Sequence, residues 1–157
     1  ELITKGPHMM EGYWRRPEET KKTIIDGWLY TGDMAEIDED GFIYLVDRKK
    51  DMIISGGMNI YSAEVEHALS QHPAVNEVIV IGIPDEKWGE VVCGVVVKSP
   101  DREVNEDELI QFCGQKLSAY KKPKKIEFLD YIPRTTVGKL DKKLVRQKYW
   151  EGKDRNI

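Results

Sequence analysis

The spacing of apolar residues along the chain changes near residue 50. Before that point, short apolar runs broken by glycine and proline predict strands and turns. One short helix is expected to open at Pro17, because proline suits the first helical turn. The apolar runs 35–38 and 42–46 flank Glu39-Asp40-Gly41, a sequence that predicts a hairpin turn. The first third of the chain is therefore expected to be rich in β-structure.

After residue 50, strand-like and helix-like patterns alternate. Strands are predicted at residues 52–54, 75–83, 91–97 and 125–132, and helices at residues 63–71, at residues 105–119 and from Asp141 onward. Ser62 and Asn105 are expected to be N-caps, and Leu144 and Val145 are expected to face inward. Segment 91–97 is rich in β-branched residues and apolar on both faces, which favours a central strand.

These patterns predict an α+β fold in three parts. Residues 1–49 form a β-rich segment. Residues 50–150 form a small domain with a central, roughly three-stranded sheet, a β-hairpin and flanking helices. Residues 151–157 form a polar tail that is expected to fray.

Composition fits a globular protein of 157 residues, with 33% charged and 40% apolar positions. No apolar run approaches the roughly 20 residues that span a bilayer. The first residues, 1–5, lack Met and a signal-peptide pattern, so we expect a piece of something longer that acts in the cytoplasm. Cys93 and Cys113 lie in apolar surroundings, which predicts buried free thiols in a reducing compartment. The three histidines are scattered, and no metal site is predicted.

The net charge of −4 conceals a basic segment near the end of the chain. Residues 116–148 hold eleven Lys or Arg against three acidic residues, a local net charge of +8, which leaves about −12 for the remainder. Such a segment can be a solvated face, a membrane contact, a nucleic-acid patch or the site of a polyanionic cofactor. Nucleic acid is the weakest of these interpretations, because the segment lacks interleaved stacking aromatics.

Three motifs carry the candidate chemistry. They are Tyr30-Thr31-Gly32-Asp33, the run from Asp47 to Tyr61 that contains Ser55-Gly56-Gly57-Met58-Asn59, and the run from Pro133 to Lys139. Taken singly, each is also typical of a surface turn or a glycine bulge. In this order and together, they resemble the C-terminal part of the AMP-forming acyl-CoA synthetases, the adenylate-forming superfamily, and most of all bacterial fatty acyl-CoA ligases. The resemblance covers essentially the whole chain, and residues 1–49 would then be the end of the large adenylating domain.

The resemblance implies that Asp33 and Arg48 bind the nucleotide. A carboxylate such as Asp33 can accept both vicinal hydroxyls of a ribose, and an arginine fork suits ribose or phosphate. A surface ion pair of Arg48 with Asp47 or Asp51 is the alternative. Lys50 matches the hinge about which the family's small domain rotates between two half-reactions. Asp47 stands where the family often has glycine.

The resemblance also implies a CoA site and one catalytic lysine. Gly56 and Gly57 would line the tunnel for the phosphopantetheine arm, Trp88 would stack on the CoA adenine, and Tyr120 and Lys122 belong to the stretch that holds CoA phosphates. Trp88 can equally pack against its own loop. Lys139 matches the lysine that offsets the charge formed when a carboxylate attacks the α-phosphate of ATP.

The whole enzyme is accordingly expected to be an acid–thiol ligase. It would convert a carboxylic acid, most simply a fatty acid, with ATP, Mg²⁺ and CoA into acyl-CoA through an acyl-adenylate. The phosphate loop, the magnesium motif and the acyl pocket are absent from this sequence and would belong to the missing N-terminal domain, so the chain alone is expected to be inactive. Alternatives are an aryl-acid ligase, a carrier-protein-loading adenylation enzyme and a non-catalytic docking module. Self-association of the fragment through exposed strand edges is possible as well, whereas nucleic acid and a transmembrane segment are not expected.

Overall fold

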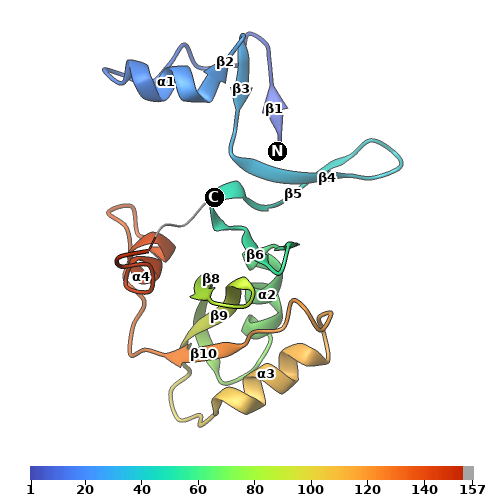
Figure 1. The fold of residues 1–157 in the computed structure, drawn as a ribbon, viewed down its shortest axis with the longest axis vertical. Coiled ribbons are helices and arrows are strands. Elements are labelled where there is room, and N and C mark those ends of the chain that lie inside the picture. The colour runs from blue at the N-terminus through green and yellow to red at the C-terminus, as the bar shows by residue number, and fades with distance from the viewer. Residues whose placement is uncertain (154–157) are drawn as a thin grey trace. The chain divides into compact units, whose positions relative to one another are not determined.

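The computed structural model describes residues 1–153, which fall into two units (Figure 1). Unit 1 comprises residues 1–50, and unit 2 begins at Asp51. Helices and strands occur together, which confirms the predicted α+β class. Residues 151–153 form a turn, and the rest of the predicted frayed tail, 154–157, lies outside the described residues.

Unit 1 is built from two small antiparallel sheets and one helix. Its elements are β1 (Ile3–Thr4), α1 (Pro17–Thr23), β2 (Ile24–Ile25), β3 (Trp28–Tyr30), β4 (Asp33–Ile37) and β5 (Ile43–Arg48). Strand β3 lies between β1 and β2, and β4 pairs with β5. The predicted helix at Pro17 is confirmed.

The predicted hairpin turn between β4 and β5 is also confirmed. Asp38 closes it, since its Oδ1 accepts the N–H groups of Asp40 at 3.1 Å and Phe42 at 2.8 Å. Its Oδ2 accepts the Tyr44 hydroxyl at 2.9 Å. These donors, with the Phe42 amide foremost, hold the pKa of Asp38 below its ordinary value of 3.8.

Unit 2 is a mixed sheet with helices on both of its faces. The 3₁₀ turn η1 (Lys49–Asp51) leads into β6 (Ile53–Ser55), β7 (Met58–Ile60), α2 (Ser62–Ser70), β8 (Val75–Asp85), β9 (Gly89–Lys98), α3 (Glu106–Gly114), β10 (Lys125–Phe128) and α4 (Lys142–Gln147). Strand β9 is central: it pairs antiparallel with β8 and parallel with β10, and a single bridge joins it to the β6–β7 hairpin. The predicted central three-stranded sheet is therefore present as β8, β9 and β10, and so is a hairpin, whose position had not been assigned from the sequence.

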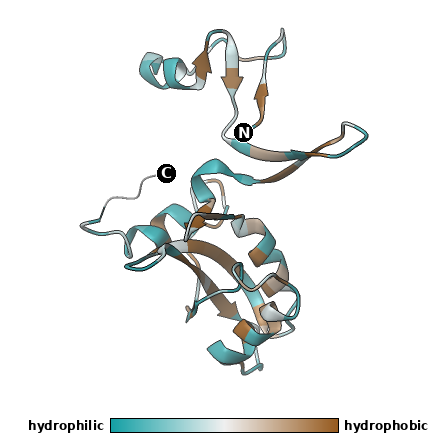
Figure 2. Ribbon diagram, turned by 45° about the vertical axis from the view of Figure 1, so that its right-hand side comes forward, coloured by the Kyte–Doolittle hydropathy of each residue, from teal (hydrophilic) through white to brown (hydrophobic). Residues whose placement is uncertain are grey.

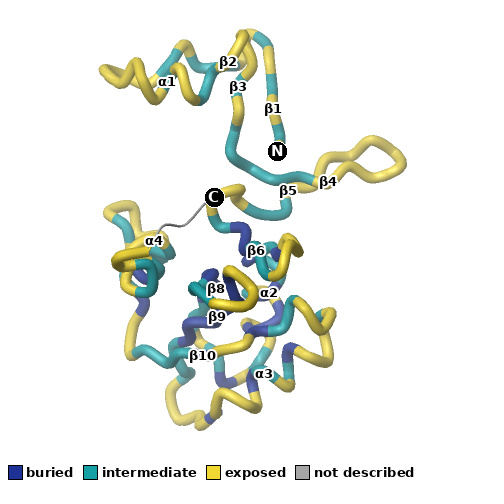
Figure 3. The backbone as a smooth tube through the Cα atoms, viewed as in Figure 1, coloured by how far each residue is buried: buried dark blue, intermediate teal, exposed yellow. Residues whose placement is uncertain are grey.

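Alternation along β8 and β9 divides the core of unit 2 into two clusters. Figure 2 shows the hydrophobic stretches of the sheet, and Figure 3 shows its buried ones. Val80, Val92 and Val96 face α2 and α3, where Leu69, Leu109 and Cys113 are buried. Ile79, Ile81, Cys93 and Val95 point the other way and pack with Ile132 and Val145 of the α4 side. Successive strand residues point to opposite faces of a sheet, so two covered faces require the continuous apolar runs seen in the sequence.

Of the two predicted helix caps, Asn105 is confirmed, and the helix predicted to begin near Asp141 is capped by that residue. Asn105 Oδ1 accepts the N–H of Glu108 at 2.9 Å, and Asp141 Oδ1 accepts that of Leu144 at 3.0 Å. Ser62 was expected to be the N-cap of α2, but it is the first helical residue and Tyr61 occupies the cap position. Ser62 is buried, and its Oγ accepts a bond from the ammonium of Lys142 at 2.8 Å.

The predicted ends of α3 and β10 were wrong for a common reason. Helix α3 ends at Gly114 instead of residue 119, and the following turn still packs Leu117 against the core. Strand β10 ends at Phe128 instead of residue 132, yet Ile132 is buried beyond it. Apolar residues in the turn after an element also pack against the core. They continue the apolar pattern of the helix or strand, so the pattern predicts an element that is too long.

Two further differences concern individual positions. Leu144 was expected to face inward, but its residue is 54% exposed, because its neighbour Val145 occupies the buried face of a short helix. Strand β7 was not predicted, since residues 58–60 follow two glycines and were interpreted as loop. No helix in residues 1–153 is long and apolar enough to cross a membrane.

Candidate functional site

The Thr31-Gly32-Asp33 turn is tied to the first strand of unit 1. Gly32 has φ +74°, a conformation that favours glycine. Thr31 Oγ1 donates to the Leu2 carbonyl at 2.8 Å and accepts the Asp33 amide at 3.1 Å, and the Leu2 amide bonds the Asp33 carbonyl. The backbone of Asp33 is thus held on both sides, which fixes where its carboxylate emerges.

Asp33 and Arg48 lie opposite each other in the β4–β5 register and form an ion pair. The Nε of Arg48 lies 2.7 Å from Oδ1 of Asp33, with the side chains 58% and 28% exposed. The structure therefore brings together the two residues predicted to bind the nucleotide. An exposed ion pair contributes little to the stability of the fold. Asp33 or Arg48 could therefore leave the pair and bind a hydroxyl or phosphate of a ligand at a small cost in free energy.

Glu1 and Lys49 extend this cluster, and sequence reasoning missed both. Glu1 Oε1 accepts the Gly32 amide at 3.0 Å, and Glu1 Oε2 pairs with Lys49 Nζ at 2.9 Å. The Lys49 ammonium holds the pKa of Glu1 below its ordinary value, and the Gly32 amide adds to this. No local sequence signal links residues 48 positions apart, so only the fold reveals the contact.

Lys50, the predicted hinge, is an exposed residue in the 3₁₀ turn η1 and is the last residue of unit 1. The next residue, Asp51, is largely buried and pairs with Arg146 of α4 at 3.4 Å. Lys50 therefore lies between strand β5 of unit 1 and Asp51, a residue that an ion pair holds in unit 2.

Gly56 and Gly57 form a two-residue turn that joins β6 to β7. Their φ values are +57° and +81°, as a type I′ hairpin turn requires, and Ser55 pairs with Met58 across it. A Cβ on Gly56 would lie 2.6 Å from Cε3 of Trp88, so the indole packs directly on this glycine. Around Gly57 the space for a Cβ is open.

A cavity of about 300 Å³ opens beside this turn. It is lined by Ser55, Gly56, Met58, Trp88, Ala119, Tyr120 and Lys124. Three residues of the predicted CoA site, Gly56, Trp88 and Tyr120, thus share one cavity, whereas Gly57 and Lys122 do not line it. Lys124 supplies its cation and was not singled out from the sequence. Apolar walls with one ammonium suit a ligand that is part aromatic and part anionic.

The basic segment 116–148 is partly neutralised within the fold. Five of its eleven cations form ion pairs: Lys121 with Glu64, Arg134 with Glu77, Lys142 with Glu66, Arg146 with Asp51, and Lys148 with Glu127. The Glu64 carboxylate accepts both close contacts of Lys121, at 2.7 and 2.8 Å, and raises the pKa of that ammonium. The net charge of the segment therefore overstates the positive charge available to a ligand.

Lys139 lies in a tight turn between Arg134 and Leu140, which form a β-bridge. Gly138 has φ +82°, and its amide bonds the Thr135 carbonyl at 2.9 Å. Lys139 is exposed, and within residues 1–153 its ammonium forms no ion pair or hydrogen bond. A closed turn thus presents a free cation.

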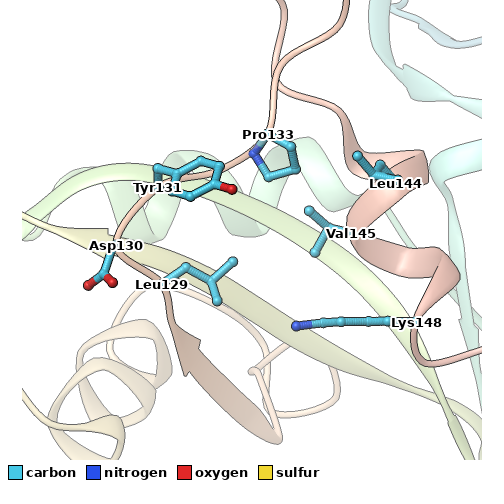
Figure 4. A pocket seen from close by; sticks show the side chains of 7 residues that line it. All are labelled: Leu129, Asp130, Tyr131, Pro133, Leu144, Val145 and Lys148. Carbon is cyan, nitrogen blue, oxygen red and sulfur yellow. The ribbon is translucent and has the colours of Figure 1, made fainter.

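A second cavity, of about 320 Å³, lies beside this turn and is lined by Leu129, Asp130, Tyr131, Pro133, Leu144, Val145 and Lys148 (Figure 4). None of the predicted site residues lines it. In the described part of the chain, no group of three or more His, Cys, Asp or Glu side chains could hold a metal ion. Cys93 and Cys113 are free and buried, and burial raises the pKa of their thiols to about 12 and about 11.

Comparisons with known proteins point to one family. The family described as AMP-binding enzyme C-terminal domain matches residues 64–139. The long-chain-fatty-acid–CoA ligase FadD13 of Mycobacterium tuberculosis is 46% identical over 95% of this chain and 29% of its own length. ATP-bound MatB from Rhodopseudomonas palustris is 38% identical, with a TM-score of 0.83 over 94% of this chain and 30% of that one.

The o-succinylbenzoate CoA synthetase MenE from Bacillus subtilis, solved with its acyl-adenylate intermediate, is 41% identical, with a TM-score of 0.83 over 98% of this chain and 30% of that one. The chain thus spans about 30% of the length of the relatives that it matches.

Proposed function

Because this chain is a C-terminal region of the AMP-forming acyl-CoA ligase family, we propose that it completes the active site of an enzyme that joins a carboxylic acid to CoA. In the first half-reaction, a carboxylate oxygen attacks the α-phosphorus of ATP and pyrophosphate leaves, which gives an acyl-adenylate. In the second, the CoA sulfur attacks the acyl carbon and AMP leaves. The observation that carries this proposal is the ammonium of Lys139, which has no partner in residues 1–153 and stands on a turn closed by hydrogen bonds at Thr135, Gly138 and Lys139.

For the first half-reaction we assign the cation to Lys139 and nucleotide binding to Asp33 and Arg48. Negative charge grows on the oxygens around the α-phosphorus, and an ammonium that reaches both phosphate and carboxylate stabilises it and holds the reactants together. The Asp33 carboxylate suits ribose hydroxyls, and the Arg48 fork suits ribose or phosphate. ATP in MatB and an acyl-adenylate in MenE support this assignment. Mg²⁺ would be held by residues outside this chain.

For the second half-reaction we assign CoA to the cavity beside the β6–β7 turn. Trp88 packs on Gly56, has the Lys87 ammonium 4.9 Å from its ring centroid and is 45% exposed. An adenine that exchanges with this ammonium would stack on the indole. Lys124 and Tyr120 line the same cavity and would bind phosphates, while Lys122 is a neighbour outside the lining. This arrangement favours CoA over a carrier protein.

Lys50 is the proposed hinge between the two half-reactions, since the boundary between the units falls immediately after it. The acid is proposed to be a fatty acid, by likeness to FadD13. An aryl acid is the second candidate, because MenE and a feruloyl-CoA synthase from Amycolatopsis sp. are about as similar. The two free thiols suit a reducing cytoplasm.

The test is an assay of the intact enzyme that contains this chain. ATP–pyrophosphate exchange in the presence of fatty or aryl acids measures adenylation, and consumption of a supplied acyl-adenylate with CoA measures transfer. We expect both activities, and we expect neither from residues 1–157 alone. An intact protein that binds ATP but forms no acyl-adenylate with any carboxylic acid would contradict the proposal.

A further inference from the structure

The peptide group between Gly138 and Lys139 is bonded at both of its polar atoms. Its carbonyl oxygen, on Gly138, accepts a hydrogen bond from Nη1 of Arg134 at 2.9 Å. Its N–H, on Lys139, donates to Thr135 Oγ1 at 3.2 Å. The Lys139 carbonyl in turn accepts the Thr135 amide at 2.7 Å. Both peptide planes that flank the Lys139 Cα are therefore fixed, although its side chain is free.

Arg134 connects this turn to the sheet. While Nη1 bonds the Gly138 carbonyl, Nη2 of the same guanidinium pairs with Glu77 on β8. A planar guanidinium with several donors can serve two acceptors at once, which a lysine ammonium does with less fixed geometry. Glu77 belongs to β8, the longest strand of unit 2, so Arg134 connects the turn to the sheet of that unit.

The other end of the turn is anchored as well. Lys142, three residues after Lys139, pairs with Glu66 of α2 at 2.7 Å and donates to Ser62 Oγ at 2.8 Å. Glu66 also accepts the backbone N–H of Val80 on β8 at 2.7 Å. The side chains of Lys142 and Glu66 are only 20% and 22% exposed, so solvent screens this pair weakly.

We propose that Arg134, oriented by Glu77, is a positioning residue for adenylation: it fixes the Gly138–Lys139 peptide and thereby the direction in which Lys139 delivers its ammonium. This role rests on the proposed function of Lys139. Arg134 lies in the run from Pro133 to Lys139 that carries the family resemblance, but the resemblance assigned a role only to Lys139 in that run. The role follows from the bonds that surround the Lys139 backbone.

The experiment measures both half-reactions in the intact enzyme for Arg134→Met, Glu77→Gln and the double charge swap Glu77→Arg with Arg134→Glu. Because misplacement of a reacting group by about 1 Å can cost up to about 100-fold in rate, we expect Arg134→Met to lower adenylation by about 10- to 100-fold. Transfer of supplied acyl-adenylate to CoA should be unchanged. Glu77→Gln should lower adenylation in the same direction but less.

The charge swap separates positioning from simple stabilisation. It restores an ion pair between positions 77 and 134, but a glutamate at 134 has no donor for the Gly138 carbonyl. The thermal midpoint should therefore recover, while adenylation and the hydrogen-exchange protection of the Lys139 amide should not. In a Lys139→Ala background, Arg134→Met should cause no further loss, because both changes act through one ammonium.

Glu103→Gln is the matched control, since it breaks an exposed ion pair with Lys98 elsewhere in unit 2 and should leave both half-reactions unchanged. The inference is overturned if the charge swap restores adenylation, if Arg134→Met slows both half-reactions equally, or if it slows neither. An unmodified enzyme that shows no pyrophosphate exchange would instead overturn the proposed function, and this role with it.

Discussion

Lys139 differs from neighbouring cations because its charge is not committed to a carboxylate. Arg134 and Lys142, on either side, pair with Glu77 and Glu66, whereas the Lys139 ammonium contacts no acceptor in the described residues. An ammonium already held by a carboxylate would have to break that pair before it could reach a phosphate. Unlike Arg134 and Lys142, Lys139 could reach a phosphate without breaking an ion pair within the described residues, which agrees with its proposed role in adenylation.

The proposed role of Lys139 predicts that the Lys139→Ala variant of the intact enzyme loses adenylation but keeps transfer to CoA. Removal of one preorganised electrostatic contact typically lowers a rate by about 10²–10³-fold, and we expect adenylation to fall by at least that much. Transfer of a supplied acyl-adenylate to CoA should continue at a near-normal rate, because the sulfur attacks the acyl carbon and no bond to the α-phosphorus forms or breaks. Rapid-quench assays of each half-reaction check this, and equal impairment of both would refute the assignment.

Alanine substitutions at Gly56 and at Gly57 form a matched pair of variants. Both Gly56 and Gly57 have positive φ, so alanine at either position costs about 1–2 kcal/mol in backbone strain. Only at Gly56 would the added Cβ meet Trp88, at 2.6 Å, and displace the indole. Since stacking of one base on an aromatic ring contributes about 1–3 kcal/mol, Gly56→Ala should raise the KM for CoA by about tenfold.

Gly57→Ala should leave the KM for CoA near that of the unmodified enzyme, because the space around its Cβ is open. Equal KM values for the two variants would mean that the position of Trp88 is unimportant for CoA. Steady-state kinetics with CoA as the varied substrate make the comparison.

Among the secondary-structure elements, the β4–β5 hairpin is the part of unit 1 with a defined pH response. The pKa of Asp38 is lowered in the folded chain, chiefly by the Phe42 amide, so its stabilising effect is present above the ordinary value of 3.8. That effect is lost as the pH falls through the lower, folded-state pKa. We therefore expect the Phe42 and Asp40 amides to lose hydrogen-exchange protection in acid. Asp38→Asn, which cannot ionise, should show no such transition, and an unchanged transition in that variant would contradict the role of Asp38.

Element types were predictable from the sequence where burial alone set the pattern. The continuous apolar runs of β8 and β9 reflect two covered faces, and the caps at Asn105 and Asp141 are local side-chain bonds. The end of β10 and the whole of β7 were not predictable in this way. Ile132 is buried although it lies after the end of β10, so its apolar side chain extends the pattern of the strand. Strand β7 forms because Gly56 and Gly57 reverse the chain, and a local pattern of apolar residues does not indicate such a reversal.

The same limit applies to the candidate site. Motifs led to Asp33, Arg48, Gly56 and Lys139, each on a turn or strand end with recognisable chemistry. The residues that hold them in place come from distant parts of the chain and carry no local signal. Lys49 with Glu1 and Lys142 with Glu66 are such pairs. Lys124 was expected only as part of the stretch 120–124 that resembles a CoA-phosphate site, and the fold places it in the cavity.

For the whole molecule, the boundary between the two units after Lys50 is the feature with the largest consequence. If the two half-reactions need different arrangements of these units, the backbone at this position must change its dihedral angles. Proline fixes φ near −65° and restricts the residue before it, so Lys50→Pro should hinder such a change. Lys50→Ala removes the side chain but leaves the backbone free.

We expect Lys50→Pro in the intact enzyme to separate the half-reactions, with pyrophosphate release retained better than transfer of supplied acyl-adenylate to CoA. This direction holds if the locked arrangement is the adenylating one, since the Lys139 turn is proposed to act in the first step and the cavity beside Gly56 in the second. Lys50→Ala should perform both steps. Equal loss of both steps in Lys50→Pro, with an unfolded circular-dichroism spectrum, would indicate damage to the η1 turn. Full retention of both steps would mean that the hinge between the two half-reactions lies at another residue.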